Sequence, residues 1–184
     1  LLPEADPEVA EAFTERYADR FTLHTGHAAT SVEETGDGIE LTARPYEYGD
    51  GGVQDGEVVV TGDELLVAAG RRPNTDVLDV EAAGVDVDER GFVETDEYLR
   101  TTADGVWALG DIAGEFLLKH SANHEARTAV RNILGDDLQA VDYTAMPWAV
   151  FASPEVAGVG ATEAELEDAG REYATRTYTY DQTA

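Results

Sequence analysis

An aspartate that follows a glycine at the end of an apolar run is the feature of this sequence best placed for chemistry. Residues 101–105 form a Thr- and Gly-containing turn, residues 106–109 are apolar, and Gly110 and Asp111 follow directly. Ligands of open α/β sheets bind where strands end at their carboxyl edge. There Gly110 lets a ligand approach the backbone, and the Asp111 carboxylate can accept a sugar hydroxyl. For an isolated pair, an ordinary helix N-cap at Asp111 is the simpler interpretation.

Two other segments contain residues suited to the same chemistry. Residues 65–69 are apolar and lead into Gly70, Arg71 and Arg72, then Pro73 and Asn74. Taken alone, Gly70 is explained by a turn and the two arginines by solvated charge. Residues 117–127 predict the start of a helix, whose amino end favours negative charge. Lys119 lies at this point and is the only lysine of the chain, which favours a function there.

In combination, these segments resemble the pyridine nucleotide-disulfide oxidoreductases. Residues 101–111 are similar to the second flavin-binding motif of that family, and residues 65–74 to the strand and turn between its NAD and FAD domains. Residues 147–163 resemble the opening of its dimerisation domain. The motifs follow the family's order over residues 57–165, and this order is more specific than any single motif.

The resemblance implies two cofactor sites. The FAD site would comprise the Asp111 carboxylate, which holds the ribityl chain, and backbone groups of the flavin-facing helix start; its residues are Gly110, Asp111, Leu117, Leu118, Lys119 and His120. The site for NAD or NADP would include Ala69 and Gly70. His24 and His27 have no partner at metal-ligand spacing, so we expect no metal site.

The resemblance also implies a reaction, in which hydride passes between NAD(P)H and a disulfide through flavin and a cysteine pair. The chain contains no cysteine. We therefore expect no catalytic residue in this chain and no turnover by the chain itself. Because the sequence opens without Met and stops in a strand-like run over residues 175–180, we expect it to be an internal segment of a longer enzyme. Expected partners are a small-molecule or lipoyl disulfide and a second subunit in a homodimer. The stretch 119–126 is most similar to the mycothione-reductase-type branch, beside dihydrolipoamide dehydrogenase and mercuric reductase.

A non-catalytic alternative remains open, namely a flavin- or nucleotide-binding sensor or assembly factor on the same fold. A Cys-x4-Cys pair upstream of Leu1 would distinguish the enzyme from this alternative.

The predicted fold class is α/β, with parts of two Rossmann-like nucleotide-binding domains followed by the start of an α+β dimerisation domain. Residues 1–68 are expected to end the NAD(P)-binding domain. Residues 69–142 are expected to form the second half of the FAD-binding domain, and residues 143–184 the start of the dimerisation domain.

Hydrophobic periodicity and capping signals place the elements. Predicted strands cover residues 21–25, 29–34, 39–43, 57–61, 64–69, 92–95, 106–109, 145–152 and 171–180, with a hairpin turn at Gly36–Gly38 and a loop over 46–56. Four helices are predicted. The first begins at Pro7 after Asp6, and the second is a short stretch that ends at Gly84. The third runs over 116–134 before Gly135, and the fourth runs from a capping box at Thr162–Glu165 to Ala169. In the helix over 116–134 we expect an inward face of Leu118, Ala122, Ala126, Ala129, Val130 and Ile133, with His124 and Glu125 on the polar face.

The net charge of −27 arises from 39 acidic and 12 basic residues. The acids are dispersed among patterned segments, which indicates a surface adapted to a salt-rich cytoplasm rather than an acidic tail. The same charge argues against nucleic acid or anionic lipid as a partner. No apolar run approaches the length of a membrane span, and the first residues do not form a signal peptide.

Overall fold

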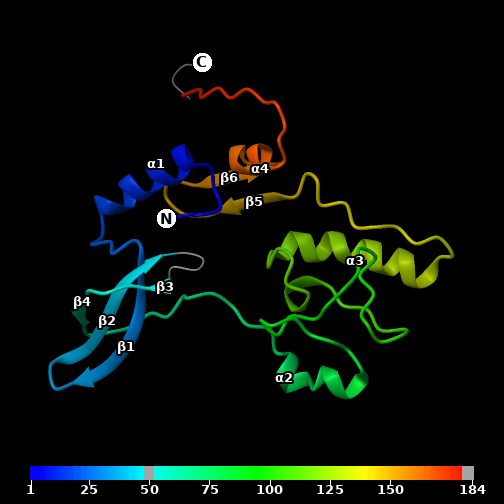
Figure 1. Ribbon diagram of the computed structural model, residues 1–184, viewed down its shortest axis with the longest axis horizontal. Coiled ribbons are helices and arrows are strands. Elements are labelled where there is room, and N and C mark those ends of the chain that lie inside the picture. The colour runs from blue at the N-terminus through cyan, green and yellow to red at the C-terminus, as the bar shows by residue number, and fades with distance from the viewer. Residues whose placement is uncertain (48–51, 180–184) are drawn as a thin grey trace. The chain divides into compact units, whose positions relative to one another are not determined.

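The computed structural model describes residues 1–47 and 52–179, and the chain divides into two units, Leu1–Ala69 and Gly70–Ala184. Figure 1 shows both, coloured from blue at the amino end to red at the carboxyl end. The two units are described separately below.

The first unit opens with helix α1, Pro7–Ala18, which has Asp6 at the N-cap and Pro7 in the first turn as predicted. Proline suits this position because its missing N–H would have no partner inside the helix. Phe13 is buried, and its ring stacks on Tyr17 with 4.6 Å between centroids. The apolar face of α1 is therefore an aromatic one.

The sheet of the first unit is antiparallel and is built on a hairpin. Strands β1, His27–Thr35, and β2, Gly38–Glu47, pair around a two-residue turn, with Thr35 opposite Gly38. Strand β4, Val58–Gly62, pairs with β2 along the same sheet, and β3, Gly52–Val53, pairs with the end of β2. The hairpin and the strand over 57–61 are thus confirmed. The predicted loop over 46–56 is interrupted, since β2 extends to Glu47 and β3 covers Gly52–Val53, and its residues 48–51 lie outside the described residues.

Two strands predicted in this unit are wrong. Residues 21–25 are irregular because Phe21 turns back on the end of α1: its N–H bonds to the Tyr17 carbonyl at 3.0 Å, and its ring stacks on that of Tyr17. Residues 64–69 are extended but unpaired within the described part of the chain, and Leu66 is 90% exposed. An apolar run forms a strand only beside a hydrogen-bonding neighbour, and none of the described strands lies beside this run.

The second unit starts with a short helix and a helical turn, α2, Thr75–Leu78, and η2, Val80–Ala83. They end at Gly84, as predicted. Irregular loops follow over residues 85–109 and bury Val85, Phe92, Val93 and Leu99. The strands predicted over 92–95 and 106–109 are each reduced to one bridge, Val87 to Val93 and Arg100 to Trp107. Residues 106–108 are held instead by backbone bonds across the loop: the Ala108 N–H bonds to the Leu99 carbonyl at 3.2 Å, and the Thr101 N–H bonds to the Val106 carbonyl at 3.0 Å.

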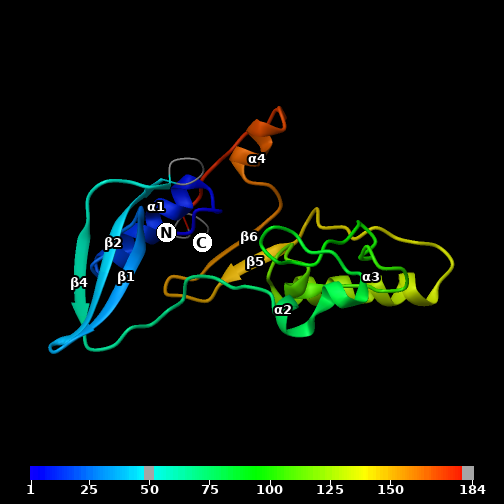
Figure 2. The same ribbon diagram turned by 60° about the horizontal axis from the view of Figure 1, so that its bottom comes forward.

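Helix α3, Lys119–Leu134, is the longest element among the described residues and begins three residues later than predicted. Figure 1 and Figure 2 both show the green loops of residues 85–115 along one side of this helix. Gly135 is the C-cap, and its N–H bonds to the Arg131 carbonyl at 2.8 Å.

The buried face of α3 differs from the predicted apolar face. Ala129 is buried as expected, but Val130 is 54% exposed and Ile133 is 53% exposed. The buried stripe is polar instead and consists of Ser121, Glu125, Thr128 and Asn132. Irregular loops present backbone N–H and C=O groups that need partners, and polar side chains provide them. Asn132, for example, donates to the carbonyls of Tyr98 and Gln139.

The remainder of the second unit is a hairpin and a capped helix. Strands β5, Pro147–Val150, and β6, Val156–Val159, pair antiparallel, with Trp148 opposite Gly158. Helix α4, Glu163–Asp168, has the predicted capping box between Thr162 and Glu165. The strand predicted over 171–180 is wrong for residues 171–179, which pair with no described strand, and Tyr180 lies outside the described residues. Tyr173 instead donates to Glu167 of α4 at 2.6 Å.

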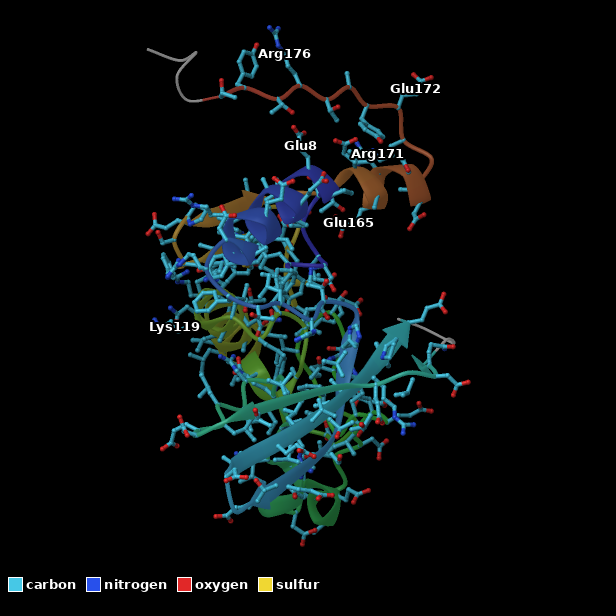
Figure 3. The ribbon with its side chains drawn as sticks, turned by 90° about the vertical axis from the view of Figure 1, so that its left-hand side faces the viewer. Glu8, Lys119, Glu165, Arg171, Glu172 and Arg176 are labelled. Atoms are coloured by element: carbon cyan, nitrogen blue, oxygen red, sulfur yellow. The ribbon has the colours of Figure 1, made fainter. Side chains whose placement is uncertain are left out.

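Acidic side chains are spread over these elements. Figure 3 labels Glu8 on α1, Glu165 on α4 and Glu172 beyond α4. Over residues 1–47 and 52–179, none of the helices combines the length and the apolar character needed to cross a membrane.

Candidate cofactor site

The candidate site centres on a helical turn, η3, which is Gly110–Ile112. Leu109 is extended and enters the turn, Gly110 has a φ of 74°, and the Ala113 N–H bonds back to the Gly110 carbonyl at 2.9 Å. A left-handed φ costs glycine little, whereas other L-residues pay about 1–2 kcal/mol. This backbone leaves the Asp111 side chain 53% exposed at the outside of the turn.

Arg71 joins this turn to the segment that precedes α3. Its Nη1 donates to the Asp111 carboxylate oxygen Oδ2 at 3.1 Å and to the Leu117 carbonyl oxygen at 2.9 Å. The guanidinium therefore contacts two residues that lie 40 and 46 positions after Arg71 in the sequence. The other carboxylate oxygen, Oδ1, receives no hydrogen bond within residues 1–47 and 52–179 and remains able to accept one.

Leu117 enters α3 through a rarely populated backbone conformation. Its φ is 49°, in the left-handed region that a leucine seldom adopts. Such conformations cost about 1–3 kcal/mol and occur more often at functional sites. The bond from Arg71 to the Leu117 carbonyl helps to hold this residue in place.

The amino end of α3 is free of acidic residues in a chain that is rich in them. Its first turn has none, whereas the first turns of α1, α2 and α4 contain Glu8, Asp76 and Glu163. Leu118 is the N-cap, and Lys119, whose side chain is exposed and labelled in Figure 3, is the first helical residue. The His120 ring bonds to the Pro147 carbonyl and so fixes this end of the helix to the start of β5. Backbone N–H groups here can stabilise a negatively charged ligand.

Glu125 also contacts the turn. It was predicted to lie on the polar, outward face of the helix, but this is wrong, since the residue is only 1% exposed. Its Oε2 accepts the Gly110 N–H at 2.5 Å, and its Oε1 accepts the Tyr143 hydroxyl at 3.0 Å. Burial, followed by the nearby Glu125 charge, raises the pKa of Tyr143, so this hydroxyl stays protonated and donates. The spacing of Ser121, Glu125, Thr128 and Asn132 on one side of α3 is the sequence signal that could have revealed a buried polar stripe.

His124, expected beside Glu125 on the polar face, is half-buried. Its Nε2 is buried and has no hydrogen-bond partner within the described residues. Its ring lies 6.5 Å from that of Tyr143 in an edge-to-face arrangement.

The residues proposed for the nicotinamide nucleotide lie on exposed, extended chain. Ala69 and Gly70 are both exposed, and Gly70 has a φ of 100° with no atom within 4 Å of the position a Cβ would take. The backbone at Gly70 is therefore open to close approach. His24 and His27 lie 6.1 Å apart edge to face, and the His27 ring bonds to the Thr25 carbonyl at 2.8 Å.

The sequence matches one family model, described as pyridine nucleotide-disulphide oxidoreductase, over residues 1–132. The chain belongs to this family. The description names a pyridine nucleotide and a disulphide, the two reactants that the resemblance over residues 57–165 implied.

Relatives in the pyridine nucleotide-disulphide oxidoreductase family include two kinds of enzyme. Mycothione reductase of Mycobacterium tuberculosis (strain ATCC 25618 / H37Rv) is 39% identical over 189 residues, which cover 100% of this chain and 39% of the relative. Dihydrolipoyl dehydrogenase 3 of Haloarcula marismortui is 39% identical over 171 residues, which cover 92% of this chain and 35% of the relative.

Solved structures support the same assignment. The HOCl-induced flavoprotein disulfide reductase RclA from Escherichia coli matches with a TM-score of 0.69 and 27% identity, over 92% of this chain and 37% of that one. LpdA from Mycobacterium tuberculosis matches with a TM-score of 0.74 and 29% identity, over 91% and 34%. The mixed α/β fold is thus confirmed, and the chain spans 34–39% of the length of these relatives.

Proposed function

We propose that this chain forms part of a flavoprotein enzyme that passes hydride between NAD(P)H and a disulphide. The observation that carries the proposal is the position of Arg71, which holds the Asp111 carboxylate and the entrance to α3 together. An acceptor for sugar hydroxyls and a helix amino end without acidic residues then lie at one place. This pair of features fits a nucleotide cofactor that has both a polyol chain and an electron-accepting ring.

The residues at this place fit FAD. Asp111 would accept a ribityl hydroxyl through its open Oδ1, and the φ of 74° at Gly110 turns the chain so that the next carboxylate faces outward. Leu117, Leu118, Lys119 and His120 would direct backbone donors toward the ring, where negative charge collects on reduction. Bound FAD would supply the hydride and electron chemistry, and these residues would orient it and tune its charge. Ala69 and Gly70 would face NAD or NADP.

The thiols of the reaction must come from elsewhere. The chain contains no cysteine, so a redox-active cysteine pair would have to lie outside these 184 residues. We therefore assign no catalytic residue within the chain. Residues 1–68 would end the NAD(P)-binding domain, and residues 69–142 would form the second half of the FAD-binding domain.

The proposed substrate is a small-molecule or lipoyl disulphide. Two relatives support this class, since one is a mycothione reductase and the other a dihydrolipoyl dehydrogenase. Both are named as enzymes, which favours catalysis over a non-catalytic sensor on the same fold. The net charge of −27 supports a cytoplasm of high salt content and no nucleic acid or membrane partner.

We further propose that residues 143–184 begin a dimerisation domain and that the enzyme is a homodimer. The hairpin of β5 and β6 leaves Phe151 89% exposed and Val159 64% exposed. A second subunit that packs on this hairpin would cover these two side chains.

The test is an assay of the full-length polypeptide with NADH or NADPH and either lipoamide or mycothione disulphide, with free thiols as the readout. We expect turnover with one of the two nucleotides and loss of turnover after alkylation of the reduced enzyme, because the thiolate is the reactive species. Full activity after complete alkylation, or an active monomer on sedimentation, would contradict the proposal.

A further inference from the structure

The buried carboxylate of Glu125 is the strongest feature that the proposed function leaves without a role. Glu125 is the largest fully buried side chain among the described residues. Burying a carboxylate is unfavourable unless donors surround it, and replacing a buried charge by an apolar group often stabilises a protein. The donors that surround the Glu125 carboxylate therefore indicate what this side chain does.

The contacts of Glu125 connect two segments, one that precedes α3 in the sequence and one that follows it. Oε2 accepts the Gly110 N–H at 2.5 Å, immediately before Asp111, and Oε1 accepts the Tyr143 hydroxyl at 3.0 Å. Both neighbours donate, which suits a carboxylate because its oxygens only accept. A hydrogen bond to a charged acceptor is shorter and stronger than one between neutral groups.

The close packing of Gly110 on α3 restricts the turn in addition to the bond from its N–H to Glu125. A Cβ at Gly110 would lie 3.2 Å from the Cβ of Ala122, one helical turn before Glu125. The glycine thus lies close against α3, and its N–H is directed at the Glu125 carboxylate. The other partner of Glu125, Tyr143, packs its ring on that of Phe116 with 5.1 Å between centroids.

We infer that Glu125 is a positioning residue for the cofactor site: it fixes the Gly110 N–H to α3 and thereby sets the direction of the Asp111 carboxylate. This inference rests on the proposed function, since it assigns Asp111 to FAD. Arg71 holds the Asp111 carboxylate from outside the turn, and Glu125 holds the main chain of the turn from inside. Glu125 on α3 therefore controls the contact of Asp111 with FAD without touching FAD itself.

The experiment compares Glu125→Leu, Glu125→Gln and Tyr143→Phe in the full-length polypeptide, by titrating FAD into the apoprotein. Glu125→Leu removes the acceptor of the Gly110 N–H, and we expect FAD affinity to fall about tenfold to a hundredfold. Glu125→Gln keeps one amide oxygen for this N–H and should restore most of the affinity. Tyr143→Phe removes only the far bond and should change affinity by less than about threefold.

Asn132→Leu is the matched control for a purely structural effect. Asn132 lies on the same buried stripe and bonds to Tyr98, Gln139 and no residue of the turn. We expect it to lower the melting temperature without changing FAD affinity. Hydrogen exchange of the peptide covering residues 109–113 should accelerate in Glu125→Leu and not in Asn132→Leu.

The outcomes separate the inference from the function on which it rests. A wild-type protein that binds no FAD would overturn both. FAD affinity in Glu125→Leu equal to wild type, or reduced only as much as in Asn132→Leu, would overturn the positioning role of Glu125 alone. Unchanged hydrogen exchange at residues 109–113 in Glu125→Leu would do the same.

Discussion

The Nη1 atom of Arg71 lies 3.1 Å from Oδ2 of Asp111 and 2.9 Å from the carbonyl oxygen of Leu117. Both charged side chains of the ion pair are more than half exposed, at 63% and 53%. Exposed ion pairs contribute only about 0–1 kcal/mol to stability. The importance of Arg71 is therefore geometric, because it sets where the carboxylate lies relative to the start of α3.

Replacing Arg71 by methionine should weaken FAD binding more than it weakens the fold. An Asp111 carboxylate that Arg71 no longer holds should bind FAD about fivefold more weakly, which corresponds to about 1 kcal/mol. Loss of an exposed ion pair should change the melting temperature little. Arg72→Met is the control, since Arg72 is 84% exposed and pairs with Asp76, which is not part of the site. Equal FAD dissociation constants for Arg71→Met and wild type would contradict this role.

Gly110→Ala should destabilise the protein through both conformation and contact. The φ of 74° costs an L-residue about 1–2 kcal/mol, and the added Cβ would lie 3.2 Å from that of Ala122. Gly105→Ala is matched in conformation, with a φ of 76° and open space around the added Cβ. Urea denaturation should show a larger loss of unfolding free energy for Gly110→Ala than for Gly105→Ala. A smaller loss would show that the turn does not pack on α3.

Asp96 predicts a pH-dependent stability. Burial alone would raise its pKa, but hydrogen bonds from the Arg100 side chain and from the Arg100 and Tyr98 N–H groups outweigh burial and lower the pKa. A pKa that is lower in the folded than in the unfolded protein adds stability at pH values above the unfolded pKa. This contribution is lost as the pH falls through the folded pKa. Asp96→Asn should therefore be less stable than wild type at pH 7, and the difference should shrink below about pH 4.

The measurement for Asp96 is urea denaturation of wild type and Asp96→Asn at pH 7 and at a pH below about 4. Asp104→Asn, at an exposed turn position, is the control and should change stability little at either pH. A difference between wild type and Asp96→Asn that grows on acidification would have the wrong sign.

The charge of the chain predicts a requirement for salt. Repulsion among dispersed carboxylates is screened in molar salt, where the Debye length is about 3 Å, and acts over about 30 Å at 0.01 M. The melting temperature should therefore rise from dilute buffer to molar KCl. Sucrose stabilises proteins without screening charge, so sucrose in dilute buffer should not raise the melting temperature as far as molar KCl does. Equal melting temperatures in dilute buffer and in KCl would contradict the adaptation to salt.

Local signals predicted the elements that depend on neighbouring residues. The hairpin of β1 and β2 follows from alternating residues around Gly36 and Asp37, and the capping box at Thr162 depends only on Glu165 three positions later. The strand predicted over 64–69 failed because pairing depends on a partner elsewhere in the chain. The sequence placed Gly110 and Asp111 at the end of a strand, but the run before them forms no strand, and the helical turn η3 that contains them was not predicted.

The parts of the site that escaped prediction involve contacts over long sequence separations. Arg71 was expected to be solvated, yet it bonds 40 residues away to Asp111. Glu125 was expected on a polar face because helical periodicity normally directs apolar residues inward. That rule fails for α3, since this helix packs on loops whose backbone groups need polar partners.

The central claim is that Asp111 holds FAD, and the most direct measurement is FAD titration of wild type, Asp111→Ala and Asp111→Asn in the full-length polypeptide. A charged acceptor contributes about 1.5–3 kcal/mol, so Asp111→Ala should lose about one to two orders of magnitude in affinity. Asp111→Asn keeps an oxygen acceptor and should lose less. Glu115→Ala, an exposed acidic residue four positions on, is the control and should bind FAD as wild type does. An Asp111→Ala variant that retains FAD as tightly as wild type would contradict the claim.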